Sequence, residues 1–306
     1  MINIITGAVS LGLLWSITAL GVFITFRVLD YADMTVDGSI VTGAAITAKM
    51  LTAGVHPVIA TLAAICGGMA AGTITGLLHT KLKIPAILSG ILTQIGLYSV
   101  NIKIMAKPNI TLLKVKTIFT VFTSSRYSIL AGGVLTALAF VTLLNLFLAT
   151  HFGNAIRATG DNEKMAKAMG IDTELMKICG LALGNGLVAF SGALISQNQG
   201  YADISMGRGS IVIGLASVII GEVLYHKNGM LNKLVSVVVG AVVYRIIIAF
   251  VIELGMDPLD LKLFTAVTVT VALSMPRMKN HILVKVKNAK TNKSKRMVLS
   301  REENAL

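Results

Sequence analysis

Charged side chains beside long apolar runs are the residues of this chain that could do chemistry. In apolar surroundings a carboxylate or guanidinium must be paired, hydrated or placed at an interface, or it must serve a polar solute. Two short clusters of such residues stand out, each joined to small Gly and Ser residues. The candidates for a polar pathway are Asp33, Asp37, Gly38 and Ser39 in the first cluster and Asp203, Arg208, Gly209 and Ser210 in the second.

Each cluster has a structural interpretation beside the functional one. Asp33 and Asp37 could gate a pore or contact a partner subunit, or they could cap helices and anchor the chain at the membrane surface. Arg208 could attract an anionic carboxylate or pair with Asp203. The glycines allow close helix packing as readily as they line a pathway.

Both clusters lie in a repeated phrase. Residues 31–44 begin with Tyr-Ala-Asp and contain Gly-Ser-Ile-Val, and residues 201–216 carry the same two groups 170 residues later. Each phrase follows a long apolar run and opens a short run that is broken by Gly. In a membrane protein such a pair predicts an internal structural repeat whose interrupted segments lie closest to a transport route.

The residue types that would indicate catalysis or metal binding lack the necessary spacing. Cys66 and Cys179 both fall inside apolar runs, and the five histidines are scattered without a ligand pattern. No nucleophile–base pair stands out, and the chain has no Gly-x-x-x-x-Gly-Lys-[Ser/Thr] loop to hold ATP phosphates. We therefore expect no catalytic site, no metal and no cofactor in this chain.

The composition of the 306 residues predicts that most of the chain lies in lipid. Hydrophobic residues make up 55% and charged residues 13%, and the mean hydropathy is +0.80. A soluble domain typically carries about 25% charged residues. The apolar runs show no strand alternation, so their backbone hydrogen bonds must close within helices. The predicted fold class is an all-α membrane protein.

About nine apolar segments are expected, of which the second and the seventh are the shortest and the most broken by Gly. Lys and Arg in the connections place the end of the last segment in the cytoplasm. Counting spans back from that end puts the connection 101–127 on the extracytoplasmic side, although it is basic. Residues 31 and 201 then lie on opposite membrane faces, which makes the repeat an inverted one with short half-helices. The segments are 4–26, 36–51, 57–78, 85–100, 128–150, 176–198, 209–224, 231–252 and 259–275.

The expected organisation is one transmembrane domain, 1–276, with a basic tail. Repeat one covers about 4–150, repeat two about 176–275, and a cytoplasmic connection, 151–175, joins them. The tail, 277–306, holds nine basic residues against two acidic ones. It adjoins a span and contains no aromatic residues, so we assign it to the cytoplasmic membrane surface and not to nucleic acid.

The connection 151–175 predicts a short amphipathic helix outside the membrane. Thr159 or Asp161 could cap this helix, its last turn would carry Lys167, and it would end at Gly170. Ala and Met form one side and charged residues form the other. Such a helix needs a surface to pack against, which could be lipid headgroups, its own chain or another protein.

Residues 157–171 read Arg-Ala-Thr-Gly-Asp-Asn-Glu-Lys-Met-Ala-Lys-Ala-Met-Gly-Ile. This stretch resembles the cytoplasmic coupling loop of ATP-binding cassette importer permeases, in the group that handles branched-chain amino acids and simple sugars. Residues 25–39 and 211–222 resemble a narrower branch of that group, which includes systems linked to amino acids. The residues assigned to ATPase coupling are Arg157, Gly160, Asn162, Lys164, Ala166, Lys167, Gly170 and Ile171.

The resemblance implies a multi-pass permease subunit in the cell membrane that forms the translocation pathway for a small polar solute. An amino acid is the expected solute, with aromatic amino acids as candidates. The implied partners are an ATP-binding cassette ATPase docked on 157–171, an extracytoplasmic substrate-binding lipoprotein, and a second permease subunit that is expected to be another copy of this chain.

The alternative is a secondary active transporter, a class that also uses inverted repeats. It would need a coupling-ion acid near the midplane of the membrane, and Glu222 and Glu253 are the only candidates. Arg245 is a further lone charge in an apolar run, with Glu253 as a candidate partner two helical turns away.

Overall fold

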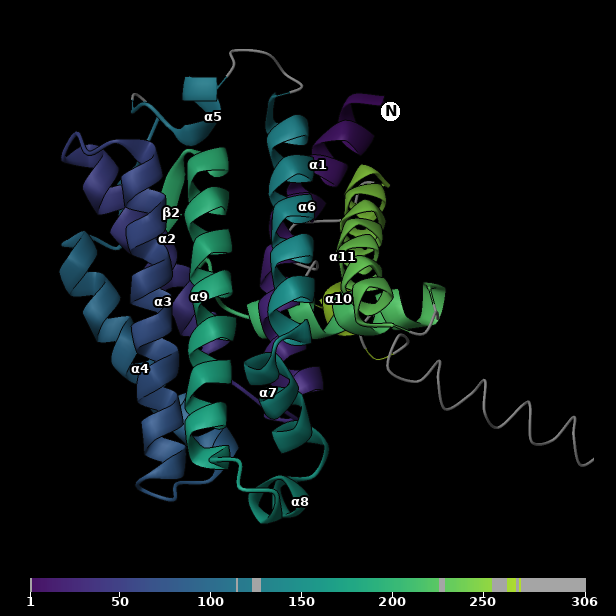
Figure 1. The fold of residues 1–306 in the computed structure, drawn as a ribbon. Coiled ribbons are helices and arrows are strands. Elements are labelled where there is room, and N and C mark those ends of the chain that lie inside the picture. Colours follow the sequence, from purple (N-terminus) through teal and green to yellow (C-terminus); the bar gives the residue numbers. More distant parts are fainter. Residues whose placement is uncertain are drawn as a thin grey trace, which may run out of the picture. The chain divides into compact units, whose positions relative to one another are not determined.

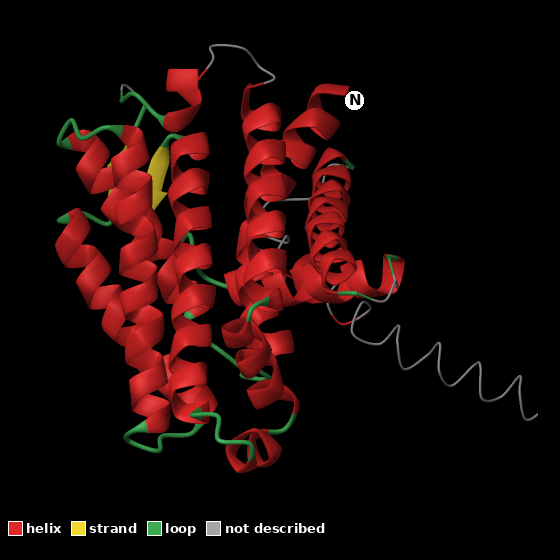
Figure 2. Ribbon diagram, viewed as in Figure 1, coloured by secondary structure: helices red, strands yellow, loops and turns green. Residues whose placement is uncertain are grey.

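The computed structural model describes residues 2–113, 115–122, 128–225, 229–254, 263–267 and 270. The chain divides into two compact units, Met1–Leu261 and Lys262–Leu306. The predicted basic tail, 277–306, lies outside the described residues. The first unit consists of helices and one small sheet (Figures 1 and 2).

Six helices of the described chain are long and apolar enough to cross a membrane. The first span, Ile4–Val28, consists of α1 (Ile2–Val22) and the π-helical segment η1 (Phe23–Val28) that continues it. The other long helices are α3 (Pro57–Thr80), α4 (Ala86–Met105), α6 (Ser128–Ala149), α9 (Thr173–Gln199) and α11 (Met230–Glu253).

Two further helices are too short to qualify as spans. α2 (Val36–Thr52) has 17 residues and α10 (Ser210–Leu224) has 15, whereas crossing the hydrocarbon core takes about 20. They are the two segments that the sequence marks as short and Gly-rich. A mainly helical membrane protein is therefore confirmed, with six long spans within the described residues in place of the nine expected. The ninth segment, 259–275, falls mostly outside those residues.

The fold is not purely helical. β1 (Asn109–Thr111) pairs antiparallel with β2 (Tyr201–Asp203), with Asn109 opposite Asp203 and Thr111 opposite Tyr201. Strands of three residues are too short to show an alternating pattern in the sequence. The sheet, together with α5 (Ile118–Phe122), lies at the end of the bundle where α9 ends.

α1 and α9 form the centre of the bundle. In each, 83% of the apolar stretch is buried, against 22% in α6 and 28% in α4. The two helices run antiparallel, because the Thr18 hydroxyl donates to the Ser191 hydroxyl oxygen at 2.8 Å while Leu29 lies against Gly180, nearer the start of α9. The two repeated phrases, which follow α1 and α9, therefore begin at opposite ends of this central pair.

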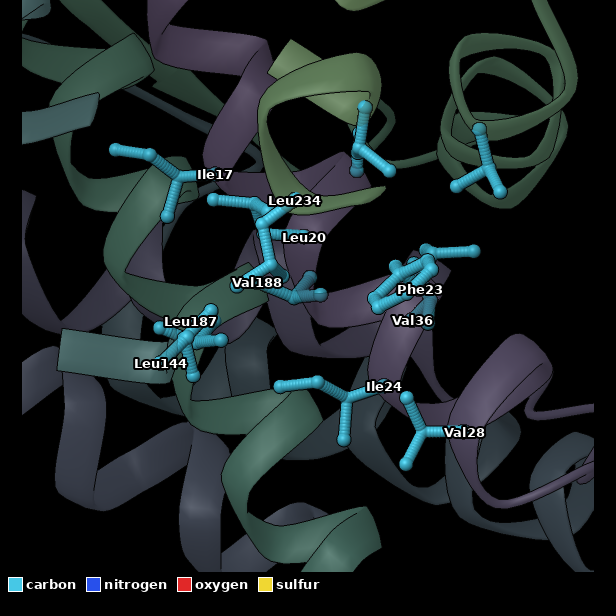
Figure 3. Packing of buried hydrophobic residues seen from close by; sticks show 14 of the residues in the cluster. Ile17, Leu20, Phe23, Ile24, Val28, Val36, Leu144, Leu187, Val188 and Leu234 are labelled. Carbon is cyan, nitrogen blue, oxygen red and sulfur yellow. The ribbon is translucent and has the colours of Figure 1, made fainter. Parts of the chain in front are cut away.

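The buried apolar side chains meet around this pair. Figure 3 shows residues of α1, η1, α2, α6, α9 and α11 turned toward one another. In lipid such burial gives little hydrophobic gain, so close van der Waals packing must hold the helices together. The labelled members are Ile17, Leu20, Phe23, Ile24, Val28, Val36, Leu144, Leu187, Val188 and Leu234.

Glycines bring the backbones close, and they do so across the two halves of the chain. A Cβ at Gly72 of α3 would overlap the Leu181 carbonyl of α9, and a Cβ at Gly12 of α1 would press on the backbone of Val242 in α11. The helix that follows each short helix therefore packs along the central helix of the other half, α3 along α9 and α11 along α1.

The two short helices follow the same rule. A Cβ at Gly43 of α2 would overlap the backbone of Ala189 in α9, and a Cβ at Gly214 of α10 would press on Val22 of α1. These two glycines occupy matching places, since each lies five residues after the glycine of Gly-Ser-Ile-Val. The repetition in sequence is thus accompanied by a repetition of packing contacts.

Candidate functional site

Asp37 joins the first turns of the two short helices. Its carboxylate accepts hydrogen bonds from the backbone N–H groups of Gly209 and Ile211, both at 2.9 Å, and from the Ser210 hydroxyl at 2.8 Å. A carboxylate at a helix N-terminus satisfies N–H groups that have no partner in the helix and interacts favourably with the helix dipole. Asp37 thus caps α10, which begins beside Gly209 with its φ of +84°.

Asp33 lies at the centre of a second buried network. Its side chain is 2% exposed, and it accepts from the Thr35 N–H at 2.9 Å and from Asn185 Nδ2 at 2.6 Å. Asn185 Oδ1 in turn accepts from the Ser39 hydroxyl at 2.6 Å. The network ties the segment before α2, α2 itself and the middle of α9 together. A buried network whose members all have partners is rigid, so these contacts give Asp33 and Ser39 a structural role.

Asp203 is the counterpart of Asp33 in the second phrase. It accepts from the Ser205 N–H at 2.7 Å, two residues on, just as Asp33 does from Thr35. Asn109 of β1 donates to its other oxygen at 3.2 Å. The predicted salt bridge to Arg208 does not occur among the ion pairs of the described residues.

Charge at Asp203 is nevertheless favoured. Burial raises the pKa of this carboxyl, but the hydrogen bonds from Ser205 and Asn109 and the nearby charge of Arg208 outweigh burial and lower the pKa below its usual value. Asp203 therefore stays ionised, and it interacts electrostatically with Arg208 without a direct contact.

A pocket of about 420 Å³ lies between α4, the first turns of α2 and the segment 204–208. Gln94, Tyr98 and Asn101 line one side of α4 at spacings of four and three residues, which is the helical period. Asn101 is 1% exposed, and its Nδ2 donates to the Gly38 carbonyl at 3.3 Å. Its Oδ1 has no hydrogen-bond partner among the described residues.

This pocket combines predicted and missed residues. Asp37, Gly38 and Arg208 were predicted to line a pathway, and all three line this pocket. The polar face of α4 was missed. The signal was present, because Gln94 and Asn101 lie seven residues apart in a mainly apolar helix, a spacing that puts both on one face.

The connection 151–175 contains two helices, where one was expected. α7 (His151–Asp161) begins directly after α6, and Thr150 accepts from the Gly153 N–H at 3.2 Å as its cap. α8 (Glu163–Ala168) is capped by Asn162, whose Oδ1 accepts from the Met165 N–H at 3.0 Å. The prediction of Thr159 or Asp161 as the cap was wrong, because the turns of α7 extend through both residues. α7 and α8 lie at the end of the bundle where α9 begins (Figure 1).

The predicted coupling residues divide into an inner and an outer set. Ala166 is fully buried, Ile171 is half-buried, and a Cβ at Gly160 would overlap the Val28 carbonyl of η1. These three therefore hold α7 and α8 against the bundle and do not form an outer surface. The exposed members are Arg157, Asn162, Lys164, Lys167 and Gly170, and the exposed apolar neighbours Met165 and Met169 lie beside them.

Glu163 fastens α8 to the start of α9. Its carboxylate accepts from Lys177 Nζ at 2.8 Å, pairs with Lys167 at 3.1 Å and accepts from the Thr173 hydroxyl at 3.3 Å. The hydrogen bond from Lys177 is the main cause that lowers the pKa of Glu163 to about 2; burial opposes it, and Lys167 adds to the lowering. The carboxylate is therefore charged at every physiological pH.

Two lone charges of the apolar runs, Glu222 and Arg245, have partners that the sequence did not indicate. Glu222 at the end of α10 pairs with Arg27 of η1 at 2.8 Å, in an exposed position. Arg245 does not pair with Glu253, since its guanidinium lies 4.3 Å from the ring centroid of Trp15 on α1. The described residues contain no group of three or more His, Cys, Asp or Glu side chains that could hold a metal ion.

The chain is similar to known permeases over most of its length. Residues 4–273 match the family model described as the permease component of a branched-chain amino acid transport system. A tyrosine transport system permease protein of Clostridioides difficile (strain R20291) is 44% identical over 282 residues, covering 91% of this chain and 92% of that protein. An uncharacterised protein of Rickettsia prowazekii (strain Madrid E) is 32% identical over 277 residues, covering 89% and 97%.

One solved structure with a similar fold supports the helical architecture. A chain of PsaBC from Streptococcus pneumoniae in complex with Fab superimposes with a TM-score of 0.51, covering 87% of this chain and 89% of that one, at 13% sequence identity. Permeases of this class generally work with an ATPase and a substrate-binding protein. The chain belongs to the branched-chain amino acid transport system permease family, and it is a permease subunit of an ATP-driven importer in the cell membrane, with no enzymatic activity of its own.

Proposed function

We propose that this permease carries an aromatic amino acid, with L-tyrosine as the first candidate, and that an extracytoplasmic binding lipoprotein delivers it. The observation that carries this proposal is the 44% identity, across 91% of the chain, to a tyrosine transport permease. The similarity extends well beyond the coupling loop, so it includes the segments that surround any pathway.

We further propose that an ATPase docks on the outer surface of α7 and α8. Arg157 and Lys164 offer positive charge there, and Met165 and Met169 offer flexible apolar contact; Met165 is 52% and Met169 72% exposed. Met side chains adapt to the shape of a partner surface. The inner side of the same helices is fixed to the bundle through Glu163 and Ala166, so a push on the outer surface would be transmitted to α9.

Alternating access would then use the two halves, about 4–150 and 176–275, as opposed bodies. The exchanged packing of α3 on α9 and of α11 on α1 supports an inverted repeat, and the Asp37 contact links the two short half-helices at its centre. Two copies of the chain would enclose one pathway. A membrane-impermeant thiol reagent should label Tyr201→Cys only from outside and Lys164→Cys only from inside, and labelling of both from one side would contradict the inverted arrangement.

The transported solute is tested in proteoliposomes that contain the permease, its ATPase and its binding protein. Labelled L-tyrosine should accumulate only when ATP is supplied on the ATPase side. Accumulation without ATP would favour the secondary transporter, for which the structure offers poor support because Glu222 is already paired with Arg27. If ATP hydrolysis is stimulated by the loaded binding protein but no aromatic amino acid accumulates, the proposed substrate is wrong.

The docking surface is tested by charge reversal. Lys164 is exposed and forms no ion pair within the described chain, so Lys164→Glu should leave the fold intact and reduce co-purification of the ATPase. Lys107→Glu is the matched control, since Lys107 is equally exposed in the connection that follows α4. Equal retention of the ATPase by the two variants would place the docking surface elsewhere.

A further inference from the structure

The pocket between α2, α4 and the segment 204–208 has polar groups that the fold itself leaves unused. Asn101 is among the residues that line the pocket, and its Oδ1 is buried and has no partner among the described residues. An unmade hydrogen bond at a buried acceptor has an energetic cost, and it persists where a ligand supplies the donor. A donor such as an ammonium or a hydroxyl group would satisfy it.

The same pocket is also lined by a positively charged residue. Arg208 is exposed, forms no ion pair within the described chain, and lines this pocket. A guanidinium presents a fork of N–H donors that matches the two oxygens of a carboxylate. Asp37, the acidic residue among the described residues that line the pocket, does not compete for Arg208, because its oxygens accept three hydrogen bonds from the start of α10.

The remaining lining is suited to an apolar or aromatic side chain. Val41, Ile95 and Ile204 contribute aliphatic surface and Tyr98 contributes a ring. The volume of about 420 Å³ falls in the range of roughly 300–1,000 Å³ for small-molecule pockets. The pocket thus offers a carboxylate partner, a hydrogen-bond acceptor and an apolar wall, which together match an α-amino acid with a large, mostly apolar side chain.

We propose that this pocket is a substrate-binding station within the permease, at which Arg208 binds the carboxylate of the amino acid and Asn101 Oδ1 accepts a hydrogen bond from its ammonium group. The inference rests on the proposed function, because it names the residues of the permease that hold the proposed substrate. It gives the permease its own selectivity, in addition to that of the binding protein.

The first experiment measures coupling in the reconstituted complex of permease, ATPase and binding protein, with labelled L-tyrosine as the probe. Arg208→Gln and Asn101→Leu should each lower the number of tyrosine molecules imported per ATP hydrolysed by about tenfold, the effect of losing one hydrogen bond to a charged group. ATP hydrolysis stimulated by the loaded binding protein should persist, whereas a merely structural defect would lower import and hydrolysis together. Lys103→Gln, an exposed cation on α4 outside the pocket, is the control.

The second experiment detects binding without transport, in the permease–ATPase complex. With Cys66 and Cys179 replaced by alanine, Ser99→Cys places one thiol in the pocket. L-tyrosine should slow its reaction with a charged thiol reagent, and tyramine, which lacks the carboxylate, should protect about tenfold less well. Arg208→Gln should abolish that difference.

The outcomes separate the two proposals. If the wild-type complex imports tyrosine but Arg208→Gln and Asn101→Leu match Lys103→Gln in molecules imported per ATP, the station is wrong and the proposed function stands. The same conclusion follows if tyrosine and tyramine protect Ser99→Cys equally. If the wild-type complex imports no tyrosine, the proposed function itself fails.

Discussion

Replacement of Asp37 by alanine should destabilise the protein far more than the loss of an ordinary helix cap. The side chain accepts three hydrogen bonds from the start of α10, two from backbone N–H groups and one from a hydroxyl. A hydrogen bond to a charged group contributes about 1.5–3 kcal/mol, and such terms do not add fully. We therefore expect Asp37→Ala to lower the free energy of unfolding by about 3–5 kcal/mol.

The matched control is Asp172→Ala. Asp172 is also a capping aspartate, but it is exposed and accepts only one backbone hydrogen bond, from the Leu175 N–H at 3.1 Å. The loss of such a cap typically costs about 1 kcal/mol. The comparison holds residue type and substitution constant and changes only the number of donors and their burial.

The measurement is the loss of monodisperse protein on heating in detergent, followed by size-exclusion chromatography. In a chain of this size a destabilisation of 1 kcal/mol lowers Tm by roughly 2–4 °C, so Asp37→Ala should lower Tm by about 6–20 °C and Asp172→Ala by about 2–4 °C. Equal shifts for the two variants would refute the reasoning, because the Asp37 carboxylate would then not be holding the start of α10.

Three further predictions concern packing, the helices α7 and α8 and the exposed ion pair. Gly72→Ala should reduce the yield of folded protein in size-exclusion chromatography, because its Cβ would overlap a backbone carbonyl. Gly96→Ala is the control, because its Cβ would have no atom within 4 Å. This second variant should leave the yield unchanged and alter the free energy of unfolding by no more than a stabilisation of about 1 kcal/mol. The carboxylate of Glu163 stabilises the fold fully above its ordinary pKa of 4.5 and loses its effect as the pH falls through about 2. The Tm difference between wild type and Glu163→Gln should therefore stay constant from pH 5 to 8 and shrink below about pH 4.5, and a difference that changes near neutral pH would contradict the low pKa. Because the pair of Glu222 with Arg27 is exposed, Glu222→Gln should change the free energy of unfolding by less than about 1 kcal/mol. ATP-driven uptake should stay intact. Loss of uptake would instead support Glu222 as an ion-coupling acid.

The sequence alone determined the features that depend on local pattern. Apolar runs fixed the long helices, because length and composition decide which segments can cross lipid. The repeated Tyr-Ala-Asp and Gly-Ser-Ile-Val groups marked the two short helices, and the pattern at 157–171 identified the family. These signals lie within short stretches of sequence, so they can be recognised without knowing which residues are in contact.

The tertiary structure decided which residues meet. Asp37 finds its partners 172 to 174 residues away in the chain, and nothing in its neighbourhood indicates that it caps α10 instead of its own helix. Arg245 finds Trp15 and not Glu253, and Ala166 of the coupling pattern turns out to face the bundle. Periodicity gives the face on which a residue lies, but the partner of that face depends on how distant helices pack, and in lipid that packing is set by steric fit between backbones.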